Sequence, residues 1–218
     1  MVPYSLLIPL LLCLLVAILV EGQHGFTVPY EWKSVDFTWP SSRIRDQAIQ
    51  NGRYDPTKIA ILDVDVYDPA NHGHQNQTMA IKTDLKRVFV TTPKFQAGIP
   101  VTLSTLSSKR ASDGSPLLEP FPSWSSQNEK DCDGLISVYR TQIDECGRLW
   151  VLDTGKLDTF TANPRKLCNP QIVVYDLNRG DKVIRKNLLF VWASRLHWSY
   201  RDGGFTFQAL VKLNNFSH

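Results

Sequence analysis

The sequence predicts an all-β fold, and three observations support this prediction. Short runs rich in Val, Ile, Tyr, Phe, Trp and Thr, which are typical of β-strands, recur along the chain. Clusters of turn-forming residues, such as Asp68-Pro69 and Asn178-Arg179-Gly180, separate these runs. One run is repeated, because RVFVTT at 87–92 aligns with RLWVLD at 148–153. Many short strands favour a sandwich, a barrel or a propeller.

One helix is predicted before the strands, at 41–51. It begins with serines after Pro40, and Gly52 follows it, as is typical of helix ends. The strands are expected at 59–67, 87–92, 100–106, 135–143, 148–152, 171–177 and 182–189.

The repeat indicates two similar β-units. Each copy follows a short acidic turn and precedes a loop and a further strand, at 99–106 in the first unit and 171–177 in the second. The copies lie about 60 residues apart, which is longer than a compact propeller blade of about 40–50 residues and leaves room for long loops.

Two aspartates, Asp144 and Asp153, flank the second copy of the repeat. They are either catalytic acids or turn residues, and we favour turns because Asp often stabilises turns by local hydrogen bonds. Trp150 is expected to pack in the core, as Phe89 would in the first unit.

Three cysteines remain once Cys13 is removed with the N-terminal segment described below. In an antiparallel unit, alternate loops lie at the same end, so Cys132 and Cys168 are expected to be close and Cys146 to lie at the opposite end. We therefore predict a Cys132–Cys168 disulfide and one unpaired thiol.

The N-terminal residues indicate export. The apolar run at 6–20 is shorter than the ~20 residues of a membrane-spanning helix, and small residues precede a cleavage point after Gly22. We predict a signal peptide at 1–22, the alternative being a membrane anchor. Asn76 and Asn215 begin N-glycosylation sequons. The protein is expected to be secreted and extracellular, without membrane attachment after cleavage.

The net charge of +3 is small, and no basic run resembles a nucleic-acid-binding arm, so no nucleic-acid partner is expected. The pair His72 and His74 near Asp68 is a candidate metal site. A polar loop beside a sequon is the favoured interpretation, because a zinc site needs three or four well-placed ligands. His197 lies in the C-terminal tail at 187–218 and carries little weight as a metal ligand. No metal or cofactor is expected.

Three sequence blocks, RVFVTTPKFQAGIPVTLSTL, LISVYRTQIDECGRLWVLDTG and CNPQIVVYDL, resemble the insect yellow and major royal jelly protein family in order and spacing. The resemblance runs from Glu31 to about Lys186. It departs from the family at Lys94-Phe95, where Arg-Trp is common.

The resemblance implies a secreted, often glycosylated, six-bladed β-propeller. This chain is too short for six units, so we expect an incomplete propeller of about two blades plus part of a third. The expected organisation is an N-terminal segment with a short helix at 23–57, blades at 58–186 and an anomalous tail at 187–218 without family resemblance.

Such a chain would be a truncated isoform or an erroneous gene model, and the partner of Cys146 would lie in the absent part. Its open blade faces and strand edges are expected to favour aggregation or retention in the secretory pathway.

For function, the resemblance implies dopachrome conversion in the melanin pathway, and therefore cuticle pigmentation. That reaction needs a base and groups that stabilise a developing enolate-like charge, but no catalytic motif such as HExxH or GxSxG is present. The alternatives are a non-enzymatic binder of a small aromatic or amine ligand in a propeller cavity, to which Trp150 or Asp153 would contribute, and a structural or nutritive secreted protein.

Overall fold

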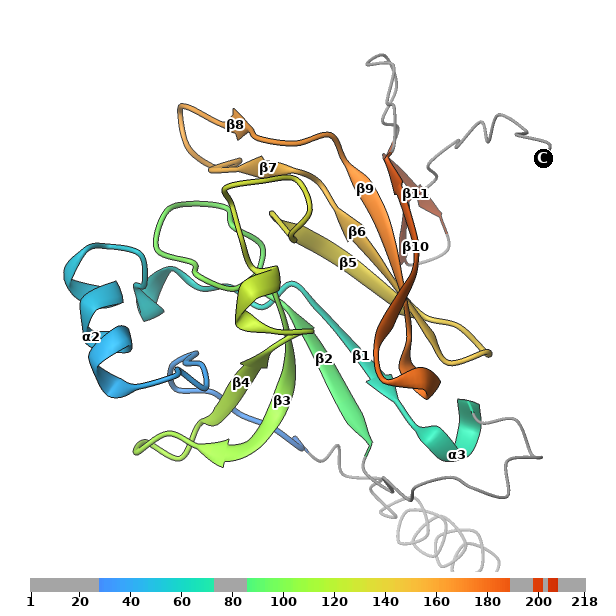
Figure 1. Ribbon diagram of the computed structural model, residues 1–218, viewed down its shortest axis with the longest axis horizontal. Coiled ribbons are helices and arrows are strands. Elements are labelled where there is room, and N and C mark those ends of the chain that lie inside the picture. Colours follow the sequence, from blue (N-terminus) through green and yellow to red (C-terminus); the bar gives the residue numbers. More distant parts are fainter. Residues whose placement is uncertain (1–27, 73–85, 189–197, 202–203, 208–218) are drawn as a thin grey trace, which may run out of the picture. The chain divides into compact units, whose positions relative to one another are not determined.

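Two four-stranded antiparallel sheets form the fold, and each winds in chain order (Figure 1). The computed structural model describes residues 28–72, 86–188, 198–201 and 204–207. Residues 1–31 and 32–218 are separate units, and everything described below belongs to the second. Sheet 1 has the order β1 (Asp63–Tyr67), β2 (Arg87–Thr91), β3 (Leu103–Arg110), β4 (Pro116–Pro120). Sheet 2 has the order β5 (Val138–Ile143), β6 (Arg148–Asp153), β9 (Gln171–Asp176), β10 (Lys182–Leu188).

The remaining elements are short. They are the helix α2 (Ser42–Gln50), the four-residue helix α3 (Pro69–His72), the 3-10 turns η1 (Pro56–Lys58), η2 (Trp124–Ser126) and η3 (Leu177–Arg179), and the hairpins β7 (Lys156–Leu157) with β8 (Arg165–Lys166) and β11 (Trp198–Arg201) with β12 (Gly204–Phe207). Antiparallel β-structure is therefore confirmed as the dominant architecture. In the described part of the chain, the two main sheets do not close into a ring.

The repeated sequence occupies the same position in both sheets. Arg87–Thr91 is the second strand of sheet 1, and Arg148–Asp153 is the second strand of sheet 2. The first strands β1 and β5 lie next to each other, where Asp63 accepts hydrogen bonds from the Thr141 amide at 2.9 Å and from Arg140 at 3.2 Å. The two sheets are thus neighbouring and similarly wound.

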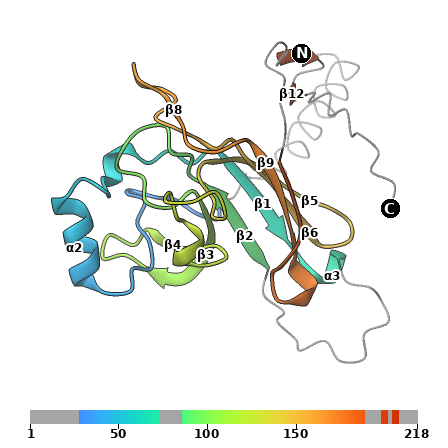
Figure 2. The same ribbon diagram turned by 45° about the horizontal axis from the view of Figure 1, so that its top comes forward.

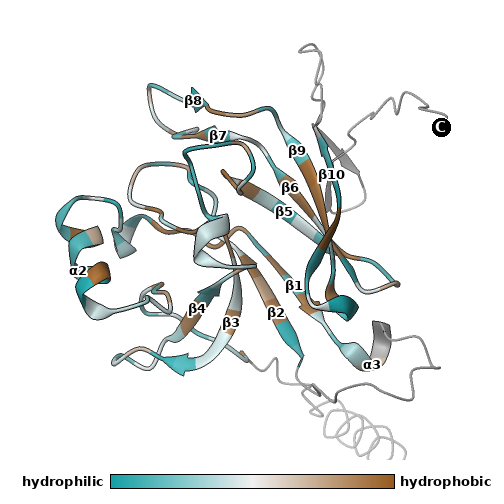
Figure 3. Ribbon diagram, viewed as in Figure 1, coloured by the Kyte–Doolittle hydropathy of each residue, from teal (hydrophilic) through white to brown (hydrophobic). Residues whose placement is uncertain are grey.

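One apolar core lies between the two sheets. It contains the following buried residues of both sheets and of the segments that flank their strands: Tyr67, Phe89, Leu103, Phe121, Leu135, Val138, Ile143, Leu149, Val151, Val173, Tyr175 and Leu177. The hydropathy colours show the same apolar segments along β2, β6 and β9 (Figure 3). Successive side chains of a β-strand point to opposite faces of the sheet. In β6, Leu149 and Val151 therefore point into this core, and Trp150 points to the other face.

The prediction that Trp150 packs in the core is therefore wrong. Its ring is half-buried, its indole N–H donates to Asp144 Oδ2 at 2.8 Å, and the Arg148 guanidinium lies 5.6 Å from the ring centroid. Phe89, by contrast, is fully buried as expected, because the face of sheet 1 that carries it is covered by sheet 2.

A second apolar core covers the opposite face of sheet 1. Here the N-terminal segment contributes Val35, Phe37, Ala48 and Tyr54, which pack on Val88, Val90, Val101 and Leu118. Phe37 forms a parallel bridge with Leu118 of β4. Helix α2 consequently lies on the side of sheet 1 away from sheet 2, as both views show (Figures 1 and 2).

The predicted helix is confirmed with its caps. Ser41 is the N-cap and its hydroxyl accepts from the Ile44 amide, and Asn51 is the C-cap. Most predicted strands are found within a few residues. The prediction for 59–67 began too early, because β1 covers only Asp63–Tyr67 and residues 59–62 lead into it from the 3-10 turn η1. The strand β4 was not predicted at all.

One ion pair joins the two sheets at the end away from the disulfide. Arg87 donates to both carboxylate oxygens of Asp181, at 2.7 and 2.9 Å, and its guanidinium lies 5.0 Å from the centre of the Phe89 ring. Paired hydrogen bonds of this kind are stronger than a single contact between exposed charges.

We expect Asp181→Asn to lower the free energy of unfolding by about 1 kcal/mol, because the bidentate pair is lost while Asn tolerates the positive φ at this position. Urea denaturation measures the change, and the loss should shrink as salt is raised. Asp46→Asn on α2 is the matched control, since Asp46 is exposed and lies 3.8 Å from Arg45. Equal stability of the Asp181 variant and the control would contradict the prediction.

Candidate functional site: a pocket at the loop end of the sheets

A pocket of about 570 Å³ opens where the N-terminal segment meets three loops. The loops follow β2, β4 and β6, and antiparallel winding brings all three to the same end of the sheets. Its residues come from 39–53, 94–100, 124–130 and 157–165. The volume falls within the range of about 300–1,000 Å³ typical of small-molecule sites.

An aromatic wall forms one side of the pocket. The rings of Trp39 and Trp124 lie 4.7 Å apart between centroids and are both half-buried. Their indole N–H groups are already engaged, since Trp39 donates to Asp36 Oδ1 at 2.8 Å and Trp124 to the Thr38 carbonyl at 3.0 Å. The faces and edges of the rings are therefore what this wall offers to a bound molecule.

A buried lysine also lines the pocket. The side chain of Lys94 is only 3% exposed, and its ammonium lies 2.6 Å from Glu129 Oε1, whose side chain is 43% exposed. Burial lowers the pKa of the Lys94 amine, and this effect outweighs the opposing attraction of Glu129 and Asp153. A perturbed lysine in a cleft marks this region as the candidate functional site.

Basic groups outnumber acidic groups around the pocket. Glu129 pairs with Lys94, and Asp158 accepts from Arg165 Nε at 2.8 Å. Arg53 and Lys130 also line the pocket, and in the described part of the chain no ion pair is formed by either.

Backbone hydrogen bonds fix the walls relative to the sheets. The Lys94 amide donates to Ser137 Oγ at 3.0 Å, and the Lys94 carbonyl accepts from the Asp158 amide at 3.0 Å. The Gly98 carbonyl accepts from the Asp55 amide at 2.9 Å. Gly98 has φ of +99°, and a Cβ atom there would lie 3.0 Å from the Asp55 side chain, so this wall requires glycine.

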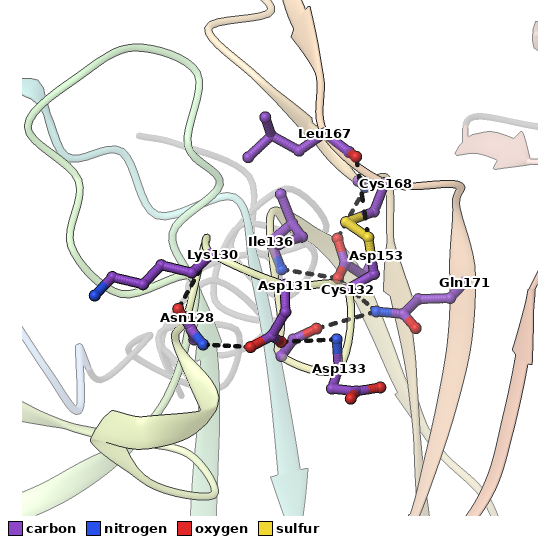
Figure 4. Close-up of a disulfide and its surroundings, with 12 residues drawn as sticks. Asn128, Lys130, Asp131, Cys132, Asp133, Ile136, Asp153, Leu167, Cys168 and Gln171 are labelled. Atoms are coloured by element: carbon purple, nitrogen blue, oxygen red, sulfur yellow. Dashed lines mark hydrogen bonds between the residues drawn. A yellow bond between two sulfur atoms is a disulfide. The ribbon is translucent and has the colours of Figure 1, made fainter.

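Asp153, the last residue of β6, is fully buried. One carboxylate oxygen accepts from the amides of Ser137 and Gly155, at 2.8 and 3.0 Å. The other accepts from the Ile136 amide and Gln171 Nε2, at 2.8 and 3.0 Å (Figure 4). Its oxygens are thus saturated by structural donors, which supports the turn interpretation over a catalytic acid.

Asp144 has a similar role at the other end of β6. It accepts from the amides of Cys146 and Arg148, and also from Arg148 Nε and Trp150 Nε1. Burial raises the pKa of Asp144, but the hydrogen bonds from Trp150 and Arg148 outweigh it and hold the pKa below its ordinary value. A carboxylate held in this way stabilises the β5–β6 turn.

The disulfide lies at the pocket end of the sheets. Cys132 and Cys168 are bonded, with their Cα atoms 5.7 Å apart, and they join the loop after β4 to the loop after β8. Cys146 is a free, exposed thiol in the β5–β6 turn. This is the pairing that the order of the loops predicts.

Several predicted features lie outside the described residues: the signal peptide at 1–22, His74 and His197, and the sequons at Asn76 and Asn215. The backbone of His72 ends α3, but its side chain is also outside them. Asp68 accepts from the Ala70 amide and pairs with Lys86 at 3.1 Å. Among the residues that the structure describes, no group of three metal-ligating side chains occurs, and no helix is long and apolar enough to cross a membrane.

Sequence reasoning missed the pocket residues Trp39, Trp124, Lys94 and Glu129. They come from separate segments and share no motif. The one signal was the departure from the family pattern at Lys94-Phe95: Lys94 lines the pocket, and Phe95 stacks on Phe160 with 4.3 Å between ring centroids.

We expect Glu129→Gln to lower the free energy of unfolding by roughly 1–2 kcal/mol at pH 7, because it leaves the Lys94 ammonium buried without its partner. The exposure of Glu129 keeps the loss below that of a fully buried pair. Since the pKa of Lys94 is lowered by folding, stability rises as pH increases from that pKa towards the usual 10.5.

The deficit of Glu129→Gln should therefore shrink at pH 9, where a larger share of Lys94 is neutral and needs no partner. Urea denaturation at both pH values tests this. Glu119→Gln, an exposed site on β4, is the control. A Glu129 variant as stable as the wild type at pH 7 would argue that the pair has no energetic role.

The chain is similar in sequence to known proteins of one family. The sequence model described as "Major royal jelly protein" matches residues 136–189. The chain is 36% identical to the dopaminechrome tautomerase of Drosophila melanogaster over 172 residues, which are 78% of this chain and 33% of that protein. It is 34% identical to protein yellow of Drosophila guanche over 183 residues, 82% of this chain and 29% of that protein.

The protein is of the class built from four-stranded antiparallel sheets. The chain belongs to the yellow and major royal jelly protein family. It spans about a third or less of the length of these curated relatives.

Proposed function

We propose that the two sheets are adjacent blades of a six-bladed propeller. Both are four-stranded meanders, and their first strands lie together as the inner strands of neighbouring blades do. Phe89 and Trp150 hold equivalent places in the second strands. Phe89 is covered by sheet 2, and Trp150 stands on the face of sheet 2 to which a third blade would pack.

We propose that the protein is a secreted, yellow-type protein of the pigmentation pathway that converts an aminochrome such as dopaminechrome. The observation that carries the proposal is the 36% identity to a dopaminechrome tautomerase over 78% of the chain. Tautomerisation moves a proton from a ring carbon to a quinone oxygen, so it needs a base and stabilisation of developing negative charge but no oxidant. The signal-peptide pattern at 1–22 supports export, and the sequons at Asn76 and Asn215 support glycosylation.

The test is to incubate the protein secreted by insect cells with dopaminechrome and to follow the decay of the aminochrome absorbance. We expect a first-order decay whose rate rises in proportion to protein concentration, with heat-inactivated protein as the control. A decay no faster than the control would discard the enzymatic proposal. Digestion with an N-glycosidase in the same preparation should lower the apparent mass if the sequons are used.

A further inference from the structure

We propose that the pocket between α2 and the loop end of the sheets binds a small planar aromatic molecule that carries a carboxylate. This inference concerns residues 39–53, 94–100, 124–130 and 157–165 alone. It does not depend on the proposed catalysis, because binding here requires neither a base nor the remainder of a propeller.

The charges around the pocket select an anion. Both acidic side chains that line it are already paired, Glu129 with Lys94 at 2.6 Å and Asp158 with Arg165 at 2.8 Å. A cationic amine would therefore have to displace an existing partner. An incoming carboxylate would instead meet two positive charges, Arg53 and Lys130, that form no ion pair among the residues described.

The two basic groups are also free to move toward a ligand. Arg53 uses only Nε to hold Asn51 Oδ1, at 3.1 Å, which leaves the two terminal nitrogens of its guanidinium for a carboxylate. The side chain of Lys130 extends away from the disulfide (Figure 4), while its backbone amide is held by Asn128 Oδ1 at 2.9 Å. The positions of their main chains are thus set by local structure, and their charged ends are exposed.

The walls select a planar, apolar ring. Trp39 and Trp124 have committed their N–H groups to Asp36 and Thr38, so they present only ring surface to the pocket. Ala48 and Leu157, both buried, extend this apolar lining. Ring stacking contributes about 0.5–1.5 kcal/mol beyond area burial, which favours an aromatic over an aliphatic carboxylate.

Isothermal titration calorimetry of the full chain tests the proposal with three probes of matched ring: indole-2-carboxylate, indole and tryptamine. We expect indole-2-carboxylate to bind at least tenfold more tightly than indole, and tryptamine to give no heat above dilution. Raising the salt concentration should weaken the binding of indole-2-carboxylate and leave the binding of indole unchanged. Equal affinity for indole and its carboxylate, a preference for tryptamine, or no binding of any probe would overturn the proposal.

The double variant Arg53→Gln/Lys130→Gln locates the site. It should lower the affinity for indole-2-carboxylate by at least tenfold and leave the affinity for indole unchanged. The matched control is Lys109→Gln/Lys182→Gln, which removes the same charge from exposed positions on β3 and β10 that do not line the pocket. All four side chains are exposed, so neither variant should unfold. Equal affinities of the two variants for the carboxylate would place binding elsewhere and reject this site.

Discussion

Asp153→Ala should lower the free energy of unfolding by about 3–5 kcal/mol, the largest effect of any single substitution considered. The change removes an acceptor from four buried donors: the amides of Ile136, Ser137 and Gly155 and the Gln171 side chain. Buried donors left without an acceptor cost about 1–3 kcal/mol each before relaxation, and several share this site. Since small domains are stable by only about 5–15 kcal/mol, a loss of this size removes a large share of the total stability.

The measurement is urea denaturation. Asp133→Ala is the control, because that aspartate lies in the same region of the chain and its side chain is fully exposed. It should change stability by no more than about 0.5 kcal/mol.

Asp153→Asn separates the structural role from a catalytic one. The amide keeps the size of the side chain but turns an N–H group toward an existing donor, so a structural role predicts a clear loss of stability. A stable Asp153→Asn protein that had lost only its activity would show that the turn interpretation is wrong.

Local sequence predicted most strands because their determinants are local. β-Branched and aromatic runs at 87–92, 148–152 and 171–177 lie between turn-forming residues, and the structure places strands there. The strand β4 was not predicted, because a proline stands at each of its ends. Proline is tolerated there because β4 ends the ladder of four strands in sheet 1.

Non-local packing could not be predicted in the same way. The burial of Phe89 and the partial exposure of Trp150 depend on which face of each sheet is covered, and the aligned sequences do not reveal this. The pocket is even harder to predict from the sequence. Trp39, Lys94 and Glu129 approach one another only because the N-terminal segment packs on sheet 1 and two loops share one end.

The disulfide was predictable because it needs only the order of the strands. Alternate loops of an antiparallel meander share an end, so Cys132 and Cys168 meet and Cys146 does not. The same rule explains why the bridge and the pocket lie together. Cys132 follows Lys130 by two positions, and the intervening loop is held by Asn128 and Asp131 at 2.8 Å (Figure 4). The bridge therefore anchors one rim of the proposed ligand site.

Removing this bridge by Cys132→Ser/Cys168→Ser should lower the free energy of unfolding by ~3–4 kcal/mol. The bridge joins two cysteines 36 positions apart, and without it the unfolded chain gains the entropy of an open loop. Cys146→Ser is the matched control and should be neutral within about 0.5 kcal/mol, since that thiol is exposed and unbonded. Urea denaturation gives the stabilities, and calorimetry with indole-2-carboxylate should show weaker binding to the double variant, because the rim carrying Glu129 and Lys130 is less ordered. A destabilised Cys146→Ser protein beside an unaffected double variant would mean that the cysteines pair differently in solution.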